Sequence, residues 1–159
     1  MNIYIADLTS ICNYDDLTDK LSPDDLARYK SFLRPTRANQ FLVAHTIKDE
    51  IADKFQYISI AHKNNFVIVA AANSPIGVDI EDTTQTRDFK AMTQFMNFEN
   101  ITSPTDFYRA FTLYEARYKA ATQTELPPHF YKLNQYMICI VSNDQETVWE
   151  NELLIPEQI

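Results

Sequence analysis

The side chains best suited to chemistry lie in residues 76–82, Ile-Gly-Val-Asp-Ile-Glu-Asp. Asp79 and Glu81 alternate there with aliphatic residues. In a β-strand, this period of two directs the aliphatic side chains into the core and both carboxylates to the opposite face. Their Cα atoms are then roughly 6 to 7 Å apart, near enough for one hard divalent cation to bridge the carboxylates. An edge strand with a solvated acidic face explains the same pattern equally well.

Gly77 is the second residue of this acidic segment and the only glycine among 159 residues. A glycine inside a strand marks either a backbone with positive φ or the close approach of another segment, because it has no Cβ. Both alternatives make residues 76–82 the constrained part of the chain, around which the rest is organised.

A second candidate group lies in residues 107–119, where apolar residues recur at helical spacing. Glu115 and Lys119 are four residues apart on one predicted face, beside Thr112. Such a pair stabilises a helix by about 0.2–0.5 kcal/mol, and a surface ion pair is the interpretation that it supports by itself. The predicted buried stripe of this helix consists of Phe107, Ala110, Phe111, Tyr114 and Tyr118.

Positive charge is concentrated between two predicted helices, where four basic residues lie within ten positions: Arg28, Lys30, Arg34 and Arg37. In a chain whose net charge is −8, this cluster predicts an anion site, with a solvated helix face as the alternative. His62 closes a predicted strand at residues 57–62 and is interpreted by itself as a structural histidine.

Composition excludes several classes of protein. The acidic net charge argues against a nucleic-acid binder, which would present a basic field. The chain shows no signal peptide, membrane-spanning run or lipidation motif, so we expect a cytoplasmic protein without a membrane partner. Cys12 and Cys139 are too few and too far apart for a zinc site or a disulfide framework.

Helical and strand patterns are mixed along the chain, which predicts the α+β class. A serine followed by proline and an acidic residue predicts helix starts at Ser22 and Ser103, since serine caps the exposed amides of a first turn. The predicted helices are 22–33, 37–54, 89–96 and one that begins at Ser103. The predicted strands are 1–8, 57–62, 66–72 and 76–82, with a closing hairpin of 136–141 and 147–154. A polar loop is predicted at 7–20.

Three of these pieces together resemble the signature of the 4′-phosphopantetheinyl transferases of the surfactin-synthetase-activator type. They are Ile58-Ser59-Ile60-Ala61-His62, Ile76-Gly77-Val78-Asp79-Ile80-Glu81, and Phe111-Thr112 followed by Glu115-Ala116 and Lys119. The pieces occur in the family's order and span residues 58–119, and residues 22–48 show a weaker resemblance to the same family. The combination is more specific than any single piece.

The resemblance implies a fold of two similar α/β lobes around a pseudo-twofold axis, each with antiparallel strands and a long helix. The lobes would be residues 1–74 and 75–159, dividing near residues 73–75, with the metal site in the second lobe. In single-chain members the two lobes replace a subunit interface, which implies a monomer.

The resemblance also implies an activity: transfer of the phosphopantetheine arm of coenzyme A to a serine of an acyl or peptidyl carrier protein. Asp79, Glu81 and Glu115 would hold Mg²⁺, and Glu115 or Glu81 would take the serine proton. Lys119 would stabilise the leaving phosphate. The coenzyme A phosphates would be bound by Arg28, Arg34, Arg37, His62 and Lys119.

The chain departs from the family's pattern at several positions. Tyr114 stands where the family helix usually has lysine, Ala61 where it has serine, and Asn39 and Gln40 where relatives are often basic. These differences leave two alternatives open. One is a catalytically weak or inactive homologue that binds coenzyme A or a carrier protein as a partner subunit, and the other is an unrelated acidic interaction domain.

Overall fold

The computed structural model covers residues 1–159 and describes every residue except 151–153 and 155. The helices are α1 (Asp15–Thr18), α2 (Pro23–Ser31), α3 (Pro35–Ile51), α4 (Phe89–Met96) and α5 (Pro104–Ala120), with a 3-10 helix at Leu8–Ser10. The strands are β1 (Asn2–Asp7), β2 (Tyr57–Lys63), β3 (Phe66–Ala72), β4 (Ile76–Asp82), β5 (Pro128–Leu133), β6 (Tyr136–Ser142), β7 (Val148–Trp149) and β8 (Glu157–Gln158).

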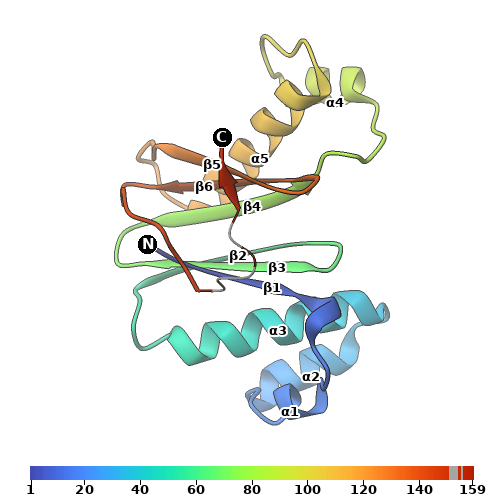
Figure 1. The fold of residues 1–159 in the computed structure, drawn as a ribbon, viewed down its shortest axis with the longest axis vertical. Coiled ribbons are helices and arrows are strands. Elements are labelled where there is room, and N and C mark those ends of the chain that lie inside the picture. Colours follow the sequence, from blue (N-terminus) through green and yellow to red (C-terminus); the bar gives the residue numbers. More distant parts are fainter. Residues whose placement is uncertain (151–153, 155) are drawn as a thin grey trace.

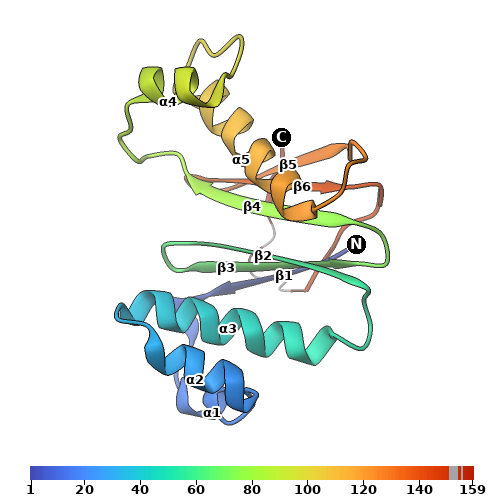
Figure 2. The same ribbon diagram turned by 180° about the vertical axis from the view of Figure 1, so that it is seen from behind.

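The elements form four layers, with two sheets between two groups of helices (Figures 1 and 2). One sheet has the order β2-β3-β1-β7 and the other β4-β6-β5-β8. Their facing sides share one apolar core, in which Ile3, Ile5 and Ile68 of the first sheet meet Val78 and Ile138 of the second. α3 covers the outer side of the first sheet and α5 that of the second. The predicted α+β class is confirmed.

The predicted helix starts are confirmed. Ser22 and Ser103 are the N-caps of α2 and α5, and each hydroxyl accepts a hydrogen bond from the amide three residues later. The bounds of β3 and β4 agree with the prediction, while α2 ends at Ser31 and α3 covers Pro35–Ile51. The predicted polar loop at 7–20 contains α1 and a 3-10 helix, so it was wrong as a structureless segment. None of the described helices has the length and apolar character that crossing a membrane requires.

The predicted closing hairpin is wrong. β6 pairs with β4 and β5, and the strand after it, β7, runs parallel to β1 in the other sheet. The actual hairpin joins β5 to β6 through Asn134, whose φ of 53° suits a tight turn. β5 has no counterpart in the sequence analysis, and part of the predicted strand 147–154 lies outside the described residues.

α5 packs so tightly on β4 that Gly77 has no room for a side chain. A Cβ on Gly77 would lie 2.0 Å from the carbonyl oxygen of Ala116 and 2.8 Å from the amide nitrogen of Ala120. Its φ is not positive. Of the two reasons considered for this glycine, close approach is the correct one.

The same contact corrects the predicted buried stripe of α5. Tyr114 and Tyr118 are exposed, whereas the buried face consists of Phe107, Tyr108, Thr112, Ala116 and Ala120. The small residues Ala116 and Ala120 lie where the helix comes near β4 at Gly77, so Tyr114 and Tyr118 lie outside this contact. Phe107 is buried as predicted, beside Tyr108 in the first half of the helix.

Gly77→Ala should lower the free energy of unfolding by about 2–3 kcal/mol, because the new methyl group meets backbone atoms that move only if α5 moves. Urea denaturation followed by circular dichroism measures this change. Without the close approach, the same substitution would stabilise the protein by about 0.4–1 kcal/mol through the unfolded chain. Equal or greater stability of the variant would therefore contradict the contact.

Candidate functional site

Asp79 lies on the face of β4 that α5 covers, and only 6% of its surface is exposed. Its Oδ1 accepts a hydrogen bond from Lys119 Nζ at 2.7 Å. Its Oδ2 is buried and has no hydrogen-bond partner among the described residues. The interpretation of β4 as a strand with a solvated acidic face is therefore wrong, since Glu81 is also buried.

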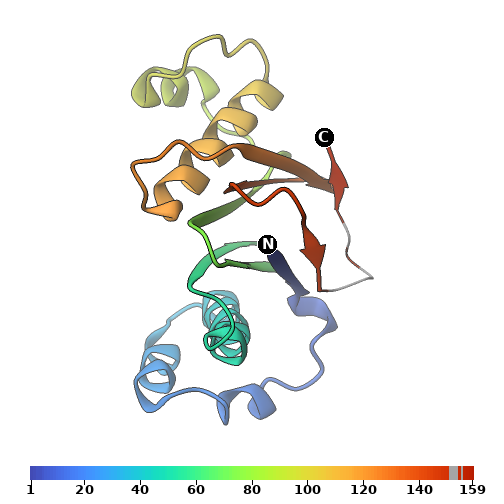
Figure 3. The ribbon, with the colours of Figure 1, turned by 90° about the vertical axis from the view of Figure 1, so that its left-hand side faces the viewer.

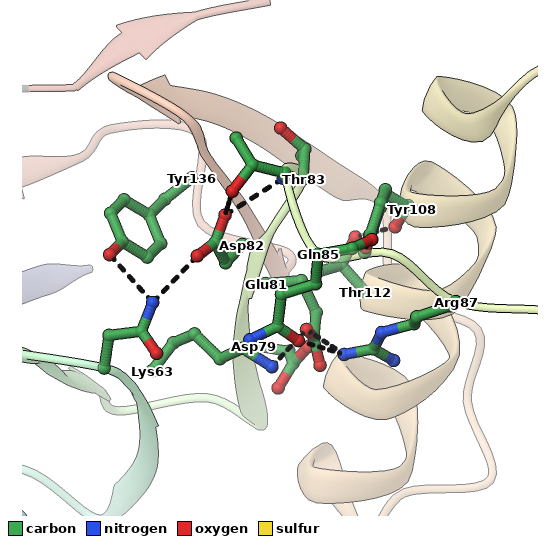
Figure 4. A network of polar contacts seen from close by, with 12 residues as sticks. Lys63, Asp79, Glu81, Asp82, Thr83, Gln85, Arg87, Tyr108, Thr112 and Tyr136 are labelled. Atoms are coloured by element: carbon green, nitrogen blue, oxygen red, sulfur yellow. Dashed lines mark hydrogen bonds and ion pairs between the residues drawn. The ribbon is translucent and has the colours of Figure 1, made fainter.

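Glu81 is held by two cations at once. Lys63 Nζ and Arg87 Nη2 each lie 2.7 Å from the same oxygen, Oε2. Lys63 comes from β2 in the first sheet, Glu81 from β4 in the second, and Arg87 from the segment between β4 and α4 (Figure 4). The trio therefore connects three separate parts of the chain at one carboxylate.

Arg87 is fixed from several sides. Its guanidinium carbon lies 5.6 Å from the ring centre of Tyr108 and 5.4 Å from that of Phe111, both on α5. Arg87 Nη2 also donates a hydrogen bond to the side chain of Gln85 at 3.2 Å. The Tyr108 hydroxyl donates a hydrogen bond to the Gln85 carbonyl at 2.8 Å. These contacts hold the guanidinium over α5, beside the acidic face of β4 (Figure 4).

Lys119 pairs with Asp79 across the strand–helix interface and not with Glu115 along its own helix, in the part of the chain that the structure describes. The predicted i, i+4 surface ion pair is therefore wrong. Glu115 is half-buried on α5, and its negative charge helps to raise the pKa of Asp79. The structure thus brings Asp79, Glu81, Glu115 and Lys119 into one electrostatic group.

The pKa of the Asp79 carboxyl is raised from 3.8 to about 6, and burial is the main cause. The ion pair with Lys119 opposes this rise, while the charges of Glu81 and Glu115 add to it. On the neighbouring strand β6, opposite Asp79 in the ladder, burial also raises the pKa of the Cys139 thiol to about 12. Cys139 is therefore not a nucleophile here.

His62 lies at the basic side of the same site. Burial, together with the positive charges of Arg37, Lys119 and Lys63, lowers its pKa from 6.5 to about 4. These residues come from α3, α5 and β2, so positive charges from three elements act on His62. An anion site at His62, Arg37 and Lys119 remains a prediction.

The two other predicted phosphate ligands lie farther out. Burial lowers the pKa of Arg37, and the charge of Arg28 contributes to this shift. The Arg28 guanidinium stacks on Phe41 with 5.3 Å to the ring centre. Arg37 stacks on Phe32 at the same distance. Arg34 is exposed at the start of α3, and no contact among the described residues joins it to His62 or Lys119.

Tyr114, at the position where the family that the motifs resemble usually has lysine, contacts residues of the outer surface of α5. Its ring makes an edge contact with Phe98, 6.1 Å between centres. It lines a groove of about 470 Å³ on the outer face of α5, together with Leu113, Arg117 and Tyr118. The substitution therefore changes this outer groove more than the surroundings of Asp79.

A divalent cation is the group that the resemblance implies for this site. Among the described residues, no group of three or more His, Cys, Asp or Glu side chains is arranged to hold a metal ion. Mg²⁺, however, is commonly bound by one or two carboxylates together with substrate phosphates and water. The partnerless Oδ2 of Asp79 and the neighbouring carboxylates fit this second mode, so the residues suit a cation shared with a phosphate ligand.

Sequence reasoning missed Lys63 and Arg87 as members of the site. Lys63 lies just beyond the predicted strand 57–62, and Arg87 lies between the predicted strand 76–82 and the predicted helix 89–96. Lys63 directly follows His62 on β2, which was the one available signal for it. Arg87 gave no signal, because its approach to Glu81 depends on how the segment 83–88 folds back over α5.

Comparison with known proteins adds no assignment: no protein-family model matches the chain, and no curated protein is significantly similar to it. The interpretation of the site therefore depends on its own geometry and on the resemblance of its motifs.

The raised pKa of Asp79 and the lowered pKa of His62 have opposite effects on stability between about pH 4 and 6.5. Folded Asp79 binds its proton more tightly than the unfolded chain does, so its contribution to stability falls as the pH rises toward 6. Folded His62 binds its proton more weakly than in the unfolded chain, so its contribution rises with pH toward 6.5.

Single variants should separate the two effects in magnesium-free buffer. His62→Gln should become less stable from pH 4 to 6, by up to about 3 kcal/mol, the equivalent of the Asp79 pKa difference. Asp79→Asn should become more stable over the same range, and the wild type should change less than either variant. Urea denaturation at several pH values measures these slopes. Parallel slopes in all three proteins would contradict the assigned pKa shifts.

Proposed function

We propose that this protein transfers the 4′-phosphopantetheine arm of coenzyme A to a serine of an acyl or peptidyl carrier protein, with Mg²⁺ and release of 3′,5′-adenosine bisphosphate. One observation carries the proposal. Lys119 of α5 contacts Asp79 of β4, and the charges of Glu81 and Glu115 act on the same carboxyl. These are the four residues that the family motif requires, from an acidic strand and a helix distant in the sequence.

The arrangement of layers supports the finer fold assignment. Each sheet packs against a long helix, α3 on the first and α5 on the second (Figure 3). The chain passes from the first sheet to the second between β3 and β4, at residues 73–75. We infer two lobes, residues 1–74 and 75–159, in which β7 of the second lobe adds to the first sheet. A monomeric, cytoplasmic protein is part of this proposal.

The proposed reaction needs charge stabilisation more than covalent chemistry. The serine oxygen attacks the β-phosphate of coenzyme A, the bond to 3′,5′-adenosine bisphosphate breaks, and the serine proton passes to Glu115 or Glu81. Lys119 stabilises the charge that develops on the leaving phosphate. His62, Arg37 and Arg28 bind the phosphates at the basic side of the site. Asp79, with Glu81 or Glu115, would hold a magnesium ion, which supplies further neutralisation of the pyrophosphate.

The second candidate is a catalytically weak or inactive homologue that binds coenzyme A or a carrier protein. It is favoured by the position of Tyr114, which puts an aromatic ring in the outer groove where the family has a cation. Calorimetry separates the two functions. If the affinity for coenzyme A does not depend on magnesium and no carrier is modified, the result supports the binding homologue.

The deciding assay combines the protein with coenzyme A, magnesium and a panel of apo carrier proteins, and weighs each carrier by mass spectrometry. The proposed function predicts a mass gain equal to one phosphopantetheine arm on at least one carrier. Absence of any gain, while a known transferase modifies the same panel, would contradict the proposal.

Lys119→Ala should reduce turnover by roughly a hundredfold or more, as loss of one preorganised charge stabiliser does. The fold should survive, although Asp79 then has no cation on Oδ1. Lys132→Ala is the matched control, because Lys132 is exposed on β5. Steady-state kinetics on the best carrier measures both variants. Full activity in folded Lys119→Ala would exclude the role assigned to this lysine.

A further inference from the structure

Lys63 and Arg87 have no role in the function proposed above, although they make the shortest contacts to one of its carboxylates. Both lie 2.7 Å from Glu81 Oε2, and both are mostly buried, with 18% of each side chain exposed. A single buried carboxylate oxygen rarely needs two full positive charges, because one ion pair already neutralises it. The second cation calls for an explanation beyond the satisfaction of Glu81.

The charges of the three carboxylates and of the three cations that act directly on Asp79 and Glu81 balance. Asp79, Glu81 and Glu115 contribute three negative charges, and Lys63, Arg87 and Lys119 contribute three positive ones. His62 adds none, since its lowered pKa keeps it neutral near pH 7. A divalent cation that enters this group competes with lysine and arginine for the carboxylates and leaves an excess of positive charge. A phosphate ligand removes that excess.

We propose that Lys63 and Arg87 are phosphate-binding residues, which pair with Glu81 in this structure and contact the pyrophosphate of coenzyme A when magnesium takes that carboxylate. This inference rests on the proposed function and adds two residues to its substrate site. Neither residue belongs to the motifs that suggested the function.

The surroundings of both residues suit this role. Arg87 keeps its position without Glu81, because the rings of Tyr108 and Phe111 and the side chain of Gln85 hold it. Lys63 is the last residue of β2, and its positive charge acts on His62, so it already lies near the basic side of the site. A guanidinium held in advance binds a phosphate at little cost in side-chain entropy.

The charge balance makes the two ligands cooperative. Magnesium alone must displace cations from Glu81 and binds weakly, and coenzyme A alone meets cations that are already paired. Together, each ligand removes the obstacle to the other. By linkage, coenzyme A must tighten magnesium binding by the same factor by which magnesium tightens coenzyme A binding.

The test uses Lys63→Gln and Arg87→Gln, which remove one positive charge each. Both variants should bind magnesium alone at least threefold more tightly, since less positive charge competes for Glu81. Both should bind coenzyme A in the presence of magnesium roughly tenfold more weakly, since a charge-assisted contact to phosphate is lost. Isothermal titration calorimetry measures the two affinities. Carrier protein is left out, so that no transfer takes place during the titration.

Arg109→Gln is the matched control, because Arg109 also stacks on an aromatic ring, that of Phe130 at 4.1 Å, but lies on an exposed part of α5. It should change neither affinity.

Parallel loss of both affinities in Lys63→Gln and Arg87→Gln indicates a structural role and overturns the proposal. No change in either affinity also overturns it. Urea denaturation shows that each variant is folded, and Lys63→Gln alone decides the question if Arg87→Gln is not.

Failure of this inference differs from failure of the proposed function. A wild type that modifies carriers, with variants of unchanged affinity, retains the function and excludes the role of Lys63 and Arg87. A wild type that binds magnesium and coenzyme A cooperatively but modifies no carrier retains the inference and contradicts only the transfer activity. A wild type that binds neither ligand contradicts both.

Discussion

The close contact of α5 with β4 at Gly77 is the constraint on which the site depends. Only a residue without Cβ lets the backbone of Ala116 and Ala120 come this near to the strand. The helix then lies low enough for Lys119 to reach Asp79 two residues further along β4. A wider spacing would leave a buried, unpaired carboxylate facing the helix, which is costly. The single glycine therefore determines both the packing and the chemistry.

The ion pairs of the site are poor candidates for stabilising the fold. Removing two charges from water costs more than most buried pairs regain, and well-packed apolar residues often serve stability better. Here three cations and three carboxylates lie beside the contact between β4 and α5. That contact is made by the small residues Gly77, Thr112 and Ala116, so apolar side chains could pack there as well. The raised pKa of Asp79 shows that the ion pair with Lys119 does not fully offset the cost of burying this carboxylate. Groups kept under such conditions are characteristic of sites that act on a ligand.

Local sequence signals predicted the parts of the fold that are determined locally. The serine caps of α2 and α5 and the bounds of β3 and β4 follow from short-range chemistry, and they were correct. The buried face of α5 was wrong because aromatic periodicity favours Tyr114 and Tyr118, whereas contact with Gly77 demands small residues. The placement of β7 beside β1 was missed because it joins opposite ends of the chain. Pairings of that kind leave no trace in a local pattern.

The same limit applied to the site. Asp79, Glu81, Glu115 and Lys119 were found because they occur in motifs, but Lys63 and Arg87 become site residues only through the junction of the two sheets. Polar contacts follow that junction along β2 and β4: the Ser59 hydroxyl accepts a hydrogen bond from the Val78 amide at 3.1 Å. Asn64 donates to Asp82 at 2.8 Å and to the Tyr136 hydroxyl at 3.0 Å. The Lys63–Glu81 ion pair is one more link in this row. The Lys63–Glu81 ion pair is part of the site and also joins the two sheets. A ligand that binds Glu81 therefore breaks one contact between the sheets, while the hydrogen bonds of Ser59 and Asn64 still hold them together.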